Sequence, residues 1–245
     1  NIYGKKNAAF LMLASEMPGL MKDIDSKKLS EIVKYEQSTR KEFDDLRDKS
    51  ILAWCIAAVP TEMWAKELYK EDNAVDILWD KIFDMCMIKE DNPTEIWNKK
   101  IEKLQERGKK LTNYQFKTLE YTSSNGTDFT IDLPKNHIWA SGREKLASGK
   151  EVLVNFPTEE VFTSPKYDTC NGIVSASKPL IYNDKLIDKF WFQFENGKVI
   201  HYDAKVGLDV LKTIIETDDH SCYLGEIALV NDNSPVSSSN STEDT

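Results

Sequence analysis

The stretch that decides the fold class reads Ile51-Leu52-Ala53-Trp54-Cys55-Ile56-Ala57-Ala58-Val59-Pro60-Thr61-Glu62. Its first nine residues form a continuous apolar run, which predicts a buried strand of the kind found in parallel sheets. Thr61 is a favourable N-cap, and Glu62 would lie in the first turn of the helix that it caps. A strand followed at once by a capped helix indicates an α/β unit.

Helices are predicted to dominate the rest of the region up to residue 112. They run from the cap at Asp25-Ser26 through Leu46, from Val75 to Met87, and from Pro93 to about Lys110. We interpret the charged middle of the first helix as a solvated face. No strand other than 51–59 is predicted here, and the apolar run over residues 7–13 receives no strand assignment.

Beyond Tyr114 the hydrophobic period changes to two, which is typical of half-buried strands. Asn125-Gly126 lies between two such runs and predicts a β-hairpin. Further strands are predicted at 151–155, 172–177, 190–194, 198–202 and 226–230, with one helix at 206–216. We therefore expect an α/β (α+β) protein with a helical α/β region at 1–112 and a β-rich region at 113–233. The composition of residues 234–245 predicts a disordered tail.

Composition narrows the class of protein. The 245 residues are 40% hydrophobic and 30% charged, with a net charge of −9 and a pI near 5.0. An acidic chain of this kind is not expected to bind nucleic acid or an anionic membrane surface, because both need basic contacts. No apolar run approaches the roughly 18 residues of a membrane helix. The four cysteines have neither zinc nor redox-motif spacing, which favours a reducing, cytoplasmic compartment.

The start of the chain carries neither an initiator Met nor a secretory signal. We therefore expect the sequence to begin inside a longer protein.

Two segments near the C-terminal end place glutamates among apolar and turn-forming residues. They read Asn155-Phe156-Pro157-Thr158-Glu159-Glu160-Val161-Phe162-Thr163-Ser164-Pro165 and Leu224-Gly225-Glu226-Ile227-Ala228-Leu229-Val230-Asn231-Asp232-Asn233-Ser234-Pro235. Glu159 and Glu160 are adjacent, so they point to opposite faces of a strand and only one of them can enter a given site. Glu226 begins an apolar strand, and Asp232 follows six residues later in a predicted turn.

Residue types alone leave three interpretations of these acids open. The most common one is a pair of surface carboxylates at strand ends. Carboxylates can also hold metal ions for hydrolysis, or act as the acid and base of a glycosidase.

A series of short segments in a fixed order carries a resemblance to a known family. They are Ala53-Trp54-Cys55 through Ala65, Gly126 to Thr130, Leu133-Pro134 with His137-Ile138-Trp139, Asn155 to Pro165, Lys178 to Leu180, Phe194 to Val199 and Leu224 to Pro235. In this order they resemble the thermophilic metallo-aminopeptidase family, the aminopeptidase T and aminopeptidase S group. The resemblance implies removal of N-terminal amino acids from peptides, a β-rich catalytic region over 113–233 and a homodimer.

The resemblance also implies a site with two divalent ions, of zinc, cobalt, manganese or magnesium. Glutamates, histidines, a tyrosine and an aspartate hold these ions in the family. The matching glutamates are Glu160 and Glu226, with Glu159 as the other member of its pair. Residues 237–245 contain no His or Tyr, so we expect part of the site to be missing and the chain as given to be a poor peptidase. The alternative is a non-catalytic fragment or binding module without a metal centre.

The three histidines are not expected to be metal ligands. His137 lies beside Trp139 in a predicted loop and is interpreted as structural. His201 alternates with an apolar neighbour in a strand, which predicts exposure to solvent. His220 lies six residues before Glu226, in a polar segment that predicts a surface turn.

Overall fold

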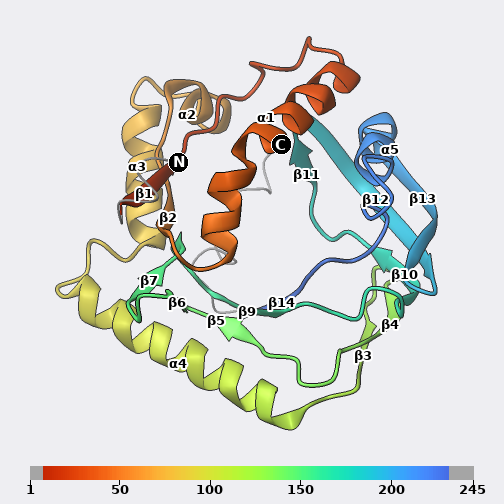
Figure 1. Cartoon of the computed structure of the whole chain (residues 1–245). Helices are drawn as coiled ribbons and strands as arrows, with labels where there is room; N and C mark the ends of the chain where they lie inside the picture. Colours follow the sequence, from red (N-terminus) through yellow and green to blue (C-terminus); the bar gives the residue numbers. More distant parts are fainter. Residues whose placement is uncertain (1–7, 232–245) are drawn as a thin grey trace.

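The computed structural model describes residues 8–231 of the chain (Figure 1). A parallel sheet near the N-terminus has the order β1 (Ala9–Ala14), β2 (Ala53–Ala58) and β8 (Asn155–Phe156). The predicted strand at 51–59 is thus confirmed as the central strand of an α/β layer. The prediction that it is the sole strand before residue 112 was wrong, because β1 pairs with it along its whole length.

Helices pack against this parallel sheet and lead away from it. They are α1 (Ser26–Asp48), α2 (Glu62–Leu68), α3 (Ala74–Met85) and α4 (Pro93–Tyr114). The hydroxyl of Thr61 accepts a hydrogen bond from the backbone N–H of Trp64 at 3.1 Å, which confirms the predicted cap. Apolar residues of α2 and α3 form a small core with Ala58 and Phe156. No helix within residues 8–231 is long and apolar enough to cross a membrane.

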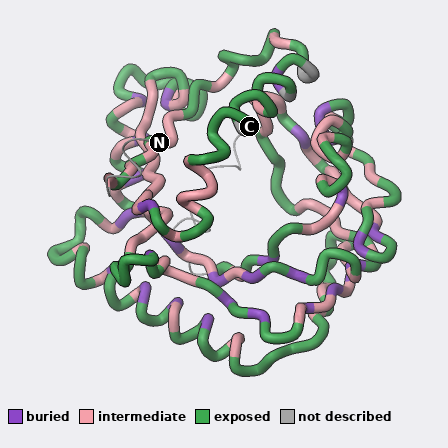
Figure 2. Tube along the Cα trace, viewed as in Figure 1, coloured by how far each residue is buried: buried purple, intermediate pink, exposed green. Residues whose placement is uncertain are grey.

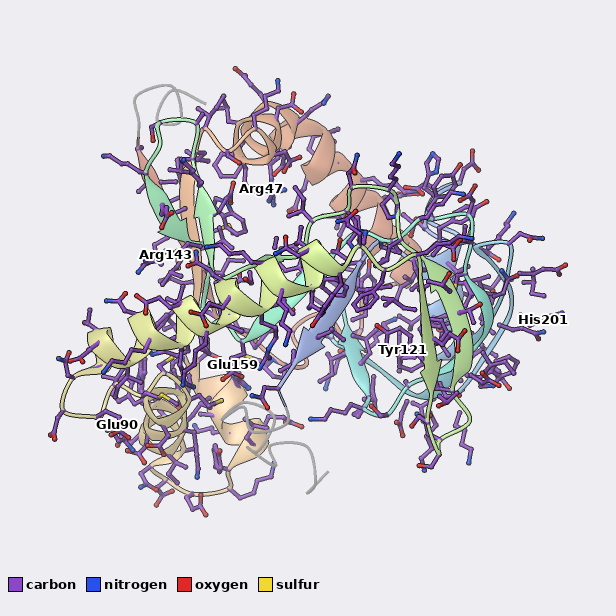
Figure 3. All side chains as sticks on the ribbon, turned by 90° about the horizontal axis from the view of Figure 1, so that it is seen from below. Arg47, Glu90, Tyr121, Arg143, Glu159 and His201 are labelled. Carbon is purple, nitrogen blue, oxygen red and sulfur yellow. The ribbon has the colours of Figure 1, made fainter. Side chains whose placement is uncertain are left out.

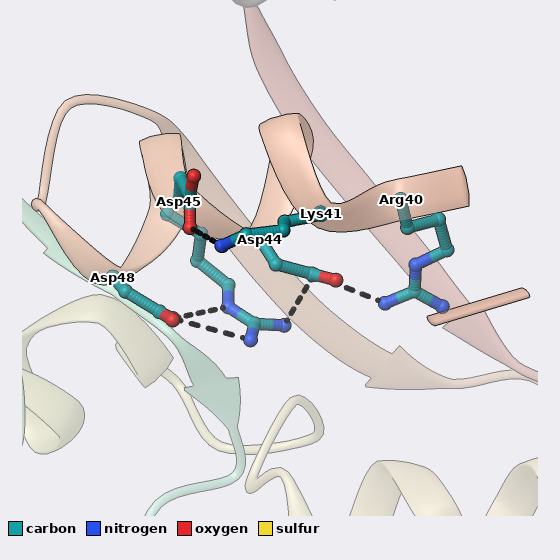
Figure 4. A network of polar contacts seen from close by, with 6 residues as sticks. Arg40, Lys41, Asp44, Asp45 and Asp48 are labelled. Atoms are coloured by element: carbon teal, nitrogen blue, oxygen red, sulfur yellow. Dashed lines mark hydrogen bonds and ion pairs between the residues drawn. The ribbon is translucent and has the colours of Figure 1, made fainter. Parts of the chain in front are cut away.

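The helix α1 is mostly exposed and is covered by ion pairs along its own surface. Arg40 pairs with Asp44 at 3.3 Å and Lys41 pairs with Asp45 at 3.0 Å, as Figure 4 shows. Arg47 lies near both Asp44 and Asp48. These contacts confirm that the charged middle of this helix is a solvated face.

The second half of the chain is built mainly of strands, as predicted. A six-stranded antiparallel sheet has the order β11-β12-β10-β4-β3, and its sixth strand, β13, also pairs with β12. Its strands are β3 (Thr118–Thr122), β4 (Asp128–Asp132), β10 (Asn171–Ser175), β11 (Leu180–Tyr182), β12 (Lys185–Glu195) and β13 (Lys198–Val206). The helix α5 (Leu208–Ile215) packs on β12. Asn125-Gly126 forms the turn between β3 and β4, with Gly126 at a φ of 91°.

Two further sheets are small. One has the order β14-β9-β5, from β5 (Ala140–Ser141), β9 (Glu160–Thr163) and β14 (Ile227–Val230). The other pairs β6 (Arg143–Lys145) with β7 (Glu151–Leu153). The strand predicted at 151–155 is divided at Val154, because β7 and β8 belong to different sheets.

The elements are arranged around a ring in Figure 1. The parallel layer and the antiparallel sheet lie on opposite sides, α1 runs between them at the top, and β9 and β14 lie at the bottom above α4. The main core joins α4 to the β-rich half through Leu104, Trp139, Val161 and Ile227. Figure 2 shows buried positions along the small sheet and along one side of α4. The β14-β9-β5 sheet therefore lies at the junction of the two halves.

Candidate metal centre

The ladder of β9 and β14 decides which side chains share a face. In this antiparallel pair Glu160 lies opposite Val230, and Thr163 lies opposite Ile227. Successive residues of a strand point to opposite faces. Val161, Thr163 and Ile227 are buried on the face toward the main core, so Glu160 lies on the other face.

Glu226 lies on the same face as Glu160. It directly precedes Ile227, whose side chain is buried, and it is itself exposed. Burial raises the pKa of Glu160, and the negative charge of Glu226 raises it further. The structure thus brings these two carboxylates, which are far apart in sequence, close enough for their charges to interact.

Glu159 lies on the opposite side of the strand. It lines a pocket next to α4, together with basic residues of that helix, and Figure 3 shows it beside α4. Of the two adjacent glutamates, Glu160 is the one that shares a face with Glu226. This geometry favours Glu160 over Glu159 as the partner of Glu226.

Two apolar side chains share the face of the sheet that carries Glu160. Phe162 is the next residue after Glu160 on the same face, and its direct partners on both neighbouring strands are alanines, Ala228 and Ala140. Alanine is too short to cover the flanks of an aromatic ring. Val230, which is 49% exposed, lies opposite Glu160. The open face of the sheet therefore offers an apolar surface beside a pair of negative charges.

The side-chain chemistry of Glu160 and Glu226 is suited to binding a divalent cation. Two carboxylates whose charges disfavour one another are the oxygen donors that hard and borderline metal ions bind, and a cation between them would relieve their repulsion. Within residues 8–231 no group of three or more His, Cys, Asp or Glu side chains could hold a metal ion. Asp232, the further acid noted in the sequence, lies outside the described residues. Within the described residues, the structure places Glu160 and Glu226 on this face.

Comparison with known proteins identifies the family of this chain. Residues 1–244 match the family described as thermophilic metalloprotease (M29). The chain belongs to the M29 family. The predicted family resemblance is confirmed, and membership in a peptidase family removes the reason for a glycosidase interpretation of the two carboxylates.

Relatives of this M29 chain are named as aminopeptidases. It is 37% identical over 239 residues to aminopeptidase AmpS of Bacillus subtilis (strain 168), covering 96% of this chain and 58% of the relative. It is 33% identical over 186 residues to aminopeptidase T of Thermus aquaticus, covering 75% of this chain and 45% of the relative. The chain spans less than two thirds of the length of these relatives.

A solved structure confirms the fold class. The structure described as wild-type AmpT from Thermus thermophilus superposes with a TM-score of 0.87 at 27% identity. The match covers 96% of this chain and 58% of that structure.

The histidines of this M29 chain lie where the sequence predicts. His137 is 6% exposed, and its Nδ1 lies 3.1 Å from the backbone oxygen of Pro134. His201 is exposed at the outer edge of the antiparallel sheet (Figure 3). The backbone N–H of His220 donates to the Asp218 carboxylate at 2.8 Å in a surface turn. None of the three belongs to a group of metal-binding side chains among the described residues.

The sequence interpretation missed the basic side of α4 that faces Glu159. Lys100, Lys103 and Arg107 line the pocket with it. Their spacing of three and four residues would have indicated one helix face. That they meet Glu159 depends on tertiary packing, which the spacing does not reveal.

Proposed function

We propose that the protein is a metal-dependent aminopeptidase that releases N-terminal amino acids from peptides. The observation that carries this proposal is the placement of Glu160 and Glu226 on one open face of the β9-β14 ladder in an M29 chain. The names of its relatives support the same activity. The proposal concerns the whole protein, because the chain spans only part of the length of those relatives.

Glu160 and Glu226 would hold two divalent ions, which zinc, cobalt, manganese or magnesium could supply. Bound metal of this kind polarises a carbonyl oxygen and lowers the pKa of water toward 7. Glu160 begins β9 and Glu226 directly precedes β14, so the pairing of these strands places both carboxylates on one face, at opposite ends of the ladder. Phe162 and Val230 supply apolar surface beside them, against which a substrate side chain could lie.

Two further properties belong to this proposal. The four cysteines are all free thiols, which supports a reducing, cytoplasmic location. The family resemblance supports a homodimer.

The test is hydrolysis of chromogenic amino-acid amides by the full-length gene product and by residues 1–245. We expect metal-dependent hydrolysis by the full-length product, loss of activity on chelation, and recovery on adding one of the four metals. Glu160→Gln should abolish turnover, whereas Glu159→Gln, its neighbour on the other face, should keep it. Activity that survives chelation, or that Glu159→Gln removes and Glu160→Gln spares, would overturn the proposal.

A second candidate is a non-catalytic module that keeps the fold without a metal centre. It is favoured by the supply of only two donors within the described residues. Absence of bound metal in the purified full-length product, together with an intact fold, would support this alternative.

A further inference from the structure

A pocket of about 220 Å³ lies between α4 and the ends of the small sheet, on the side away from Glu160. Its polar lining comes from three elements that are far apart in sequence. These residues are Lys100, Lys103 and Arg107 of α4, Thr158 and Glu159 before the body of β9, and Asn231 after β14.

The helix presents its basic residues to this pocket because of their spacing. Lys100, Lys103 and Arg107 are separated by three and four residues, which places them along one stripe of the helix. Ile101 and Leu104 on the neighbouring stripe are buried, and Leu104 belongs to the main core. Over Pro93–Tyr114 the helix carries six basic and three acidic residues, in a chain whose net charge is −9. The positive charge is therefore concentrated locally.

The charges that line the pocket do not cancel. Three cations face it and Glu159 is the carboxylate among the lining residues, so the balance is two positive charges. Lys100 Nζ also lies 5.2 Å from the centre of the Trp97 ring. Neither Lys103 nor Arg107 has an ion-pair partner in the part of the chain that the structure describes.

The donor groups suit a tetrahedral oxyanion. A guanidinium offers two parallel N–H donors to a phosphate, and lysine adds a mobile point charge. Thr158 is 8% exposed and adds a short polar side chain to the lining. A surplus of two positive charges matches a phosphate group better than a single carboxylate.

We propose that this pocket binds a phosphate group, either free or carried as a phosphomonoester by a small molecule. The site is separate from the two glutamates, and the inference does not depend on peptidase activity. Binding would place an anion against the helix α4 and against Glu159, the residue next to Glu160 in the chain.

The experiment is an NMR titration of the metal-free chain with inorganic phosphate, at ionic strength held constant with sodium chloride. We expect saturable shifts of the backbone amides of Thr158 and Asn231, with a Kd on the order of 1 mM. Arg107→Gln should weaken binding by about tenfold or more, equal to about 1.4 kcal/mol. Lys109→Gln, on the same helix but outside the pocket, is the matched control and should leave the Kd unchanged.

Phenyl phosphate and acetate complete the design. Saturation by phenyl phosphate with a lower Kd than inorganic phosphate supports a phosphomonoester as ligand, and the reverse order supports free phosphate. Acetate should bind more weakly than either. A response that never saturates, equal weakening by Arg107→Gln and Lys109→Gln, or acetate binding as tight as that of phosphate would overturn the proposal. Unchanged circular dichroism of both variants excludes unfolding as the cause, since all the substituted side chains are exposed.

Discussion

The two faces of the β14-β9-β5 sheet are made of alternating residues of the same short strands, but one face is buried in the core and the other is open to solvent. One face carries Val161 and Ile227, which are buried in the main core against α4. The other carries Glu160, Phe162 and Val230, which remain partly or largely exposed. Alternation along a strand thus places buried core side chains directly beside the carboxylate that we propose as a metal ligand. Substitutions at neighbouring positions should therefore have different kinds of effect.

The largest expected effect concerns the reactivity of Cys170, a thiol in the main core, in the native and in the denatured chain. Cys170 belongs to the same core as Val161, and burial raises its pKa to about 12. At pH 8 its thiolate fraction is about a thousandfold or more below that of an ordinary cysteine with a pKa near 8.5. Alkylation with iodoacetamide, followed by peptide mass spectrometry, should leave Cys170 unmodified in the native chain and modify it in guanidinium chloride. Rapid native modification would show that the covered face opens readily.

The next contrast concerns metal affinity on the open side. In the full-length gene product Glu160→Gln should weaken Zn²⁺ binding by about 100-fold or more, about 2.7 kcal/mol, because a ligand oxygen is replaced by an amide. Glu159→Gln removes the same charge on the other face and should change the affinity by less than about threefold. Isothermal titration calorimetry measures both. Equal losses would mean that long-range charge, rather than ligation, controls the affinity.

A matched pair of valines tests the packing difference directly. Val161 is 0% exposed and Val230 is 49% exposed, on opposite faces of the same ladder. Val161→Ala should lower the free energy of unfolding by about 2 kcal/mol, from lost burial and a residual cavity. Val230→Ala should stay within about 0.5 kcal/mol of the parent chain. Urea denaturation compares them, and similar losses would contradict the assignment of the faces.

The smallest expected effect is a gain in stability at the open face. Because the pKa of Glu160 is raised, the folded chain holds this proton more tightly than the unfolded chain. The free energy of unfolding therefore falls as pH rises from the ordinary glutamate pKa, about 4.3, through the raised value. In metal-free chain Glu160→Gln should add no more than about 1 kcal/mol at pH 7, since solvent screens this partly exposed group. Thermal melts should show no gain below pH 4, and a gain there of the same size would contradict this explanation.

Local signals made much of the fold predictable. The apolar run before Pro60, the cap at Thr61 and the turn at Asn125-Gly126 each act through neighbouring residues, and all three form as expected. The strand β1 was not predicted, and only Asn155 of β8 fell within a predicted strand, because the pairing of both with β2 depends on contacts between segments far apart in the sequence. Strands of two residues, such as β5 and β8, are too short to show a period.

From the sequence, the candidate site could be narrowed to Glu226 and one of the two adjacent glutamates, Glu159 or Glu160. Alternation requires Glu159 and Glu160 to face opposite ways, and only the burial of Val161 against α4 shows which face is covered. The pocket beside Glu159 could not be predicted. Its lining brings α4 together with residues near 158 and 231, and no local pattern links these segments.

The strand β8 has a consequence for how the chain folds. It pairs with β2 nearly a hundred positions earlier in the sequence, although helices and a hairpin separate the two. Contacts of such long range slow folding, because the intervening loop must close before they form. During synthesis the sheet of β1 and β2 could be completed only after residues 155–156 have left the ribosome. A protein that ended at residue 112 would therefore lack the β8 strand of its first sheet.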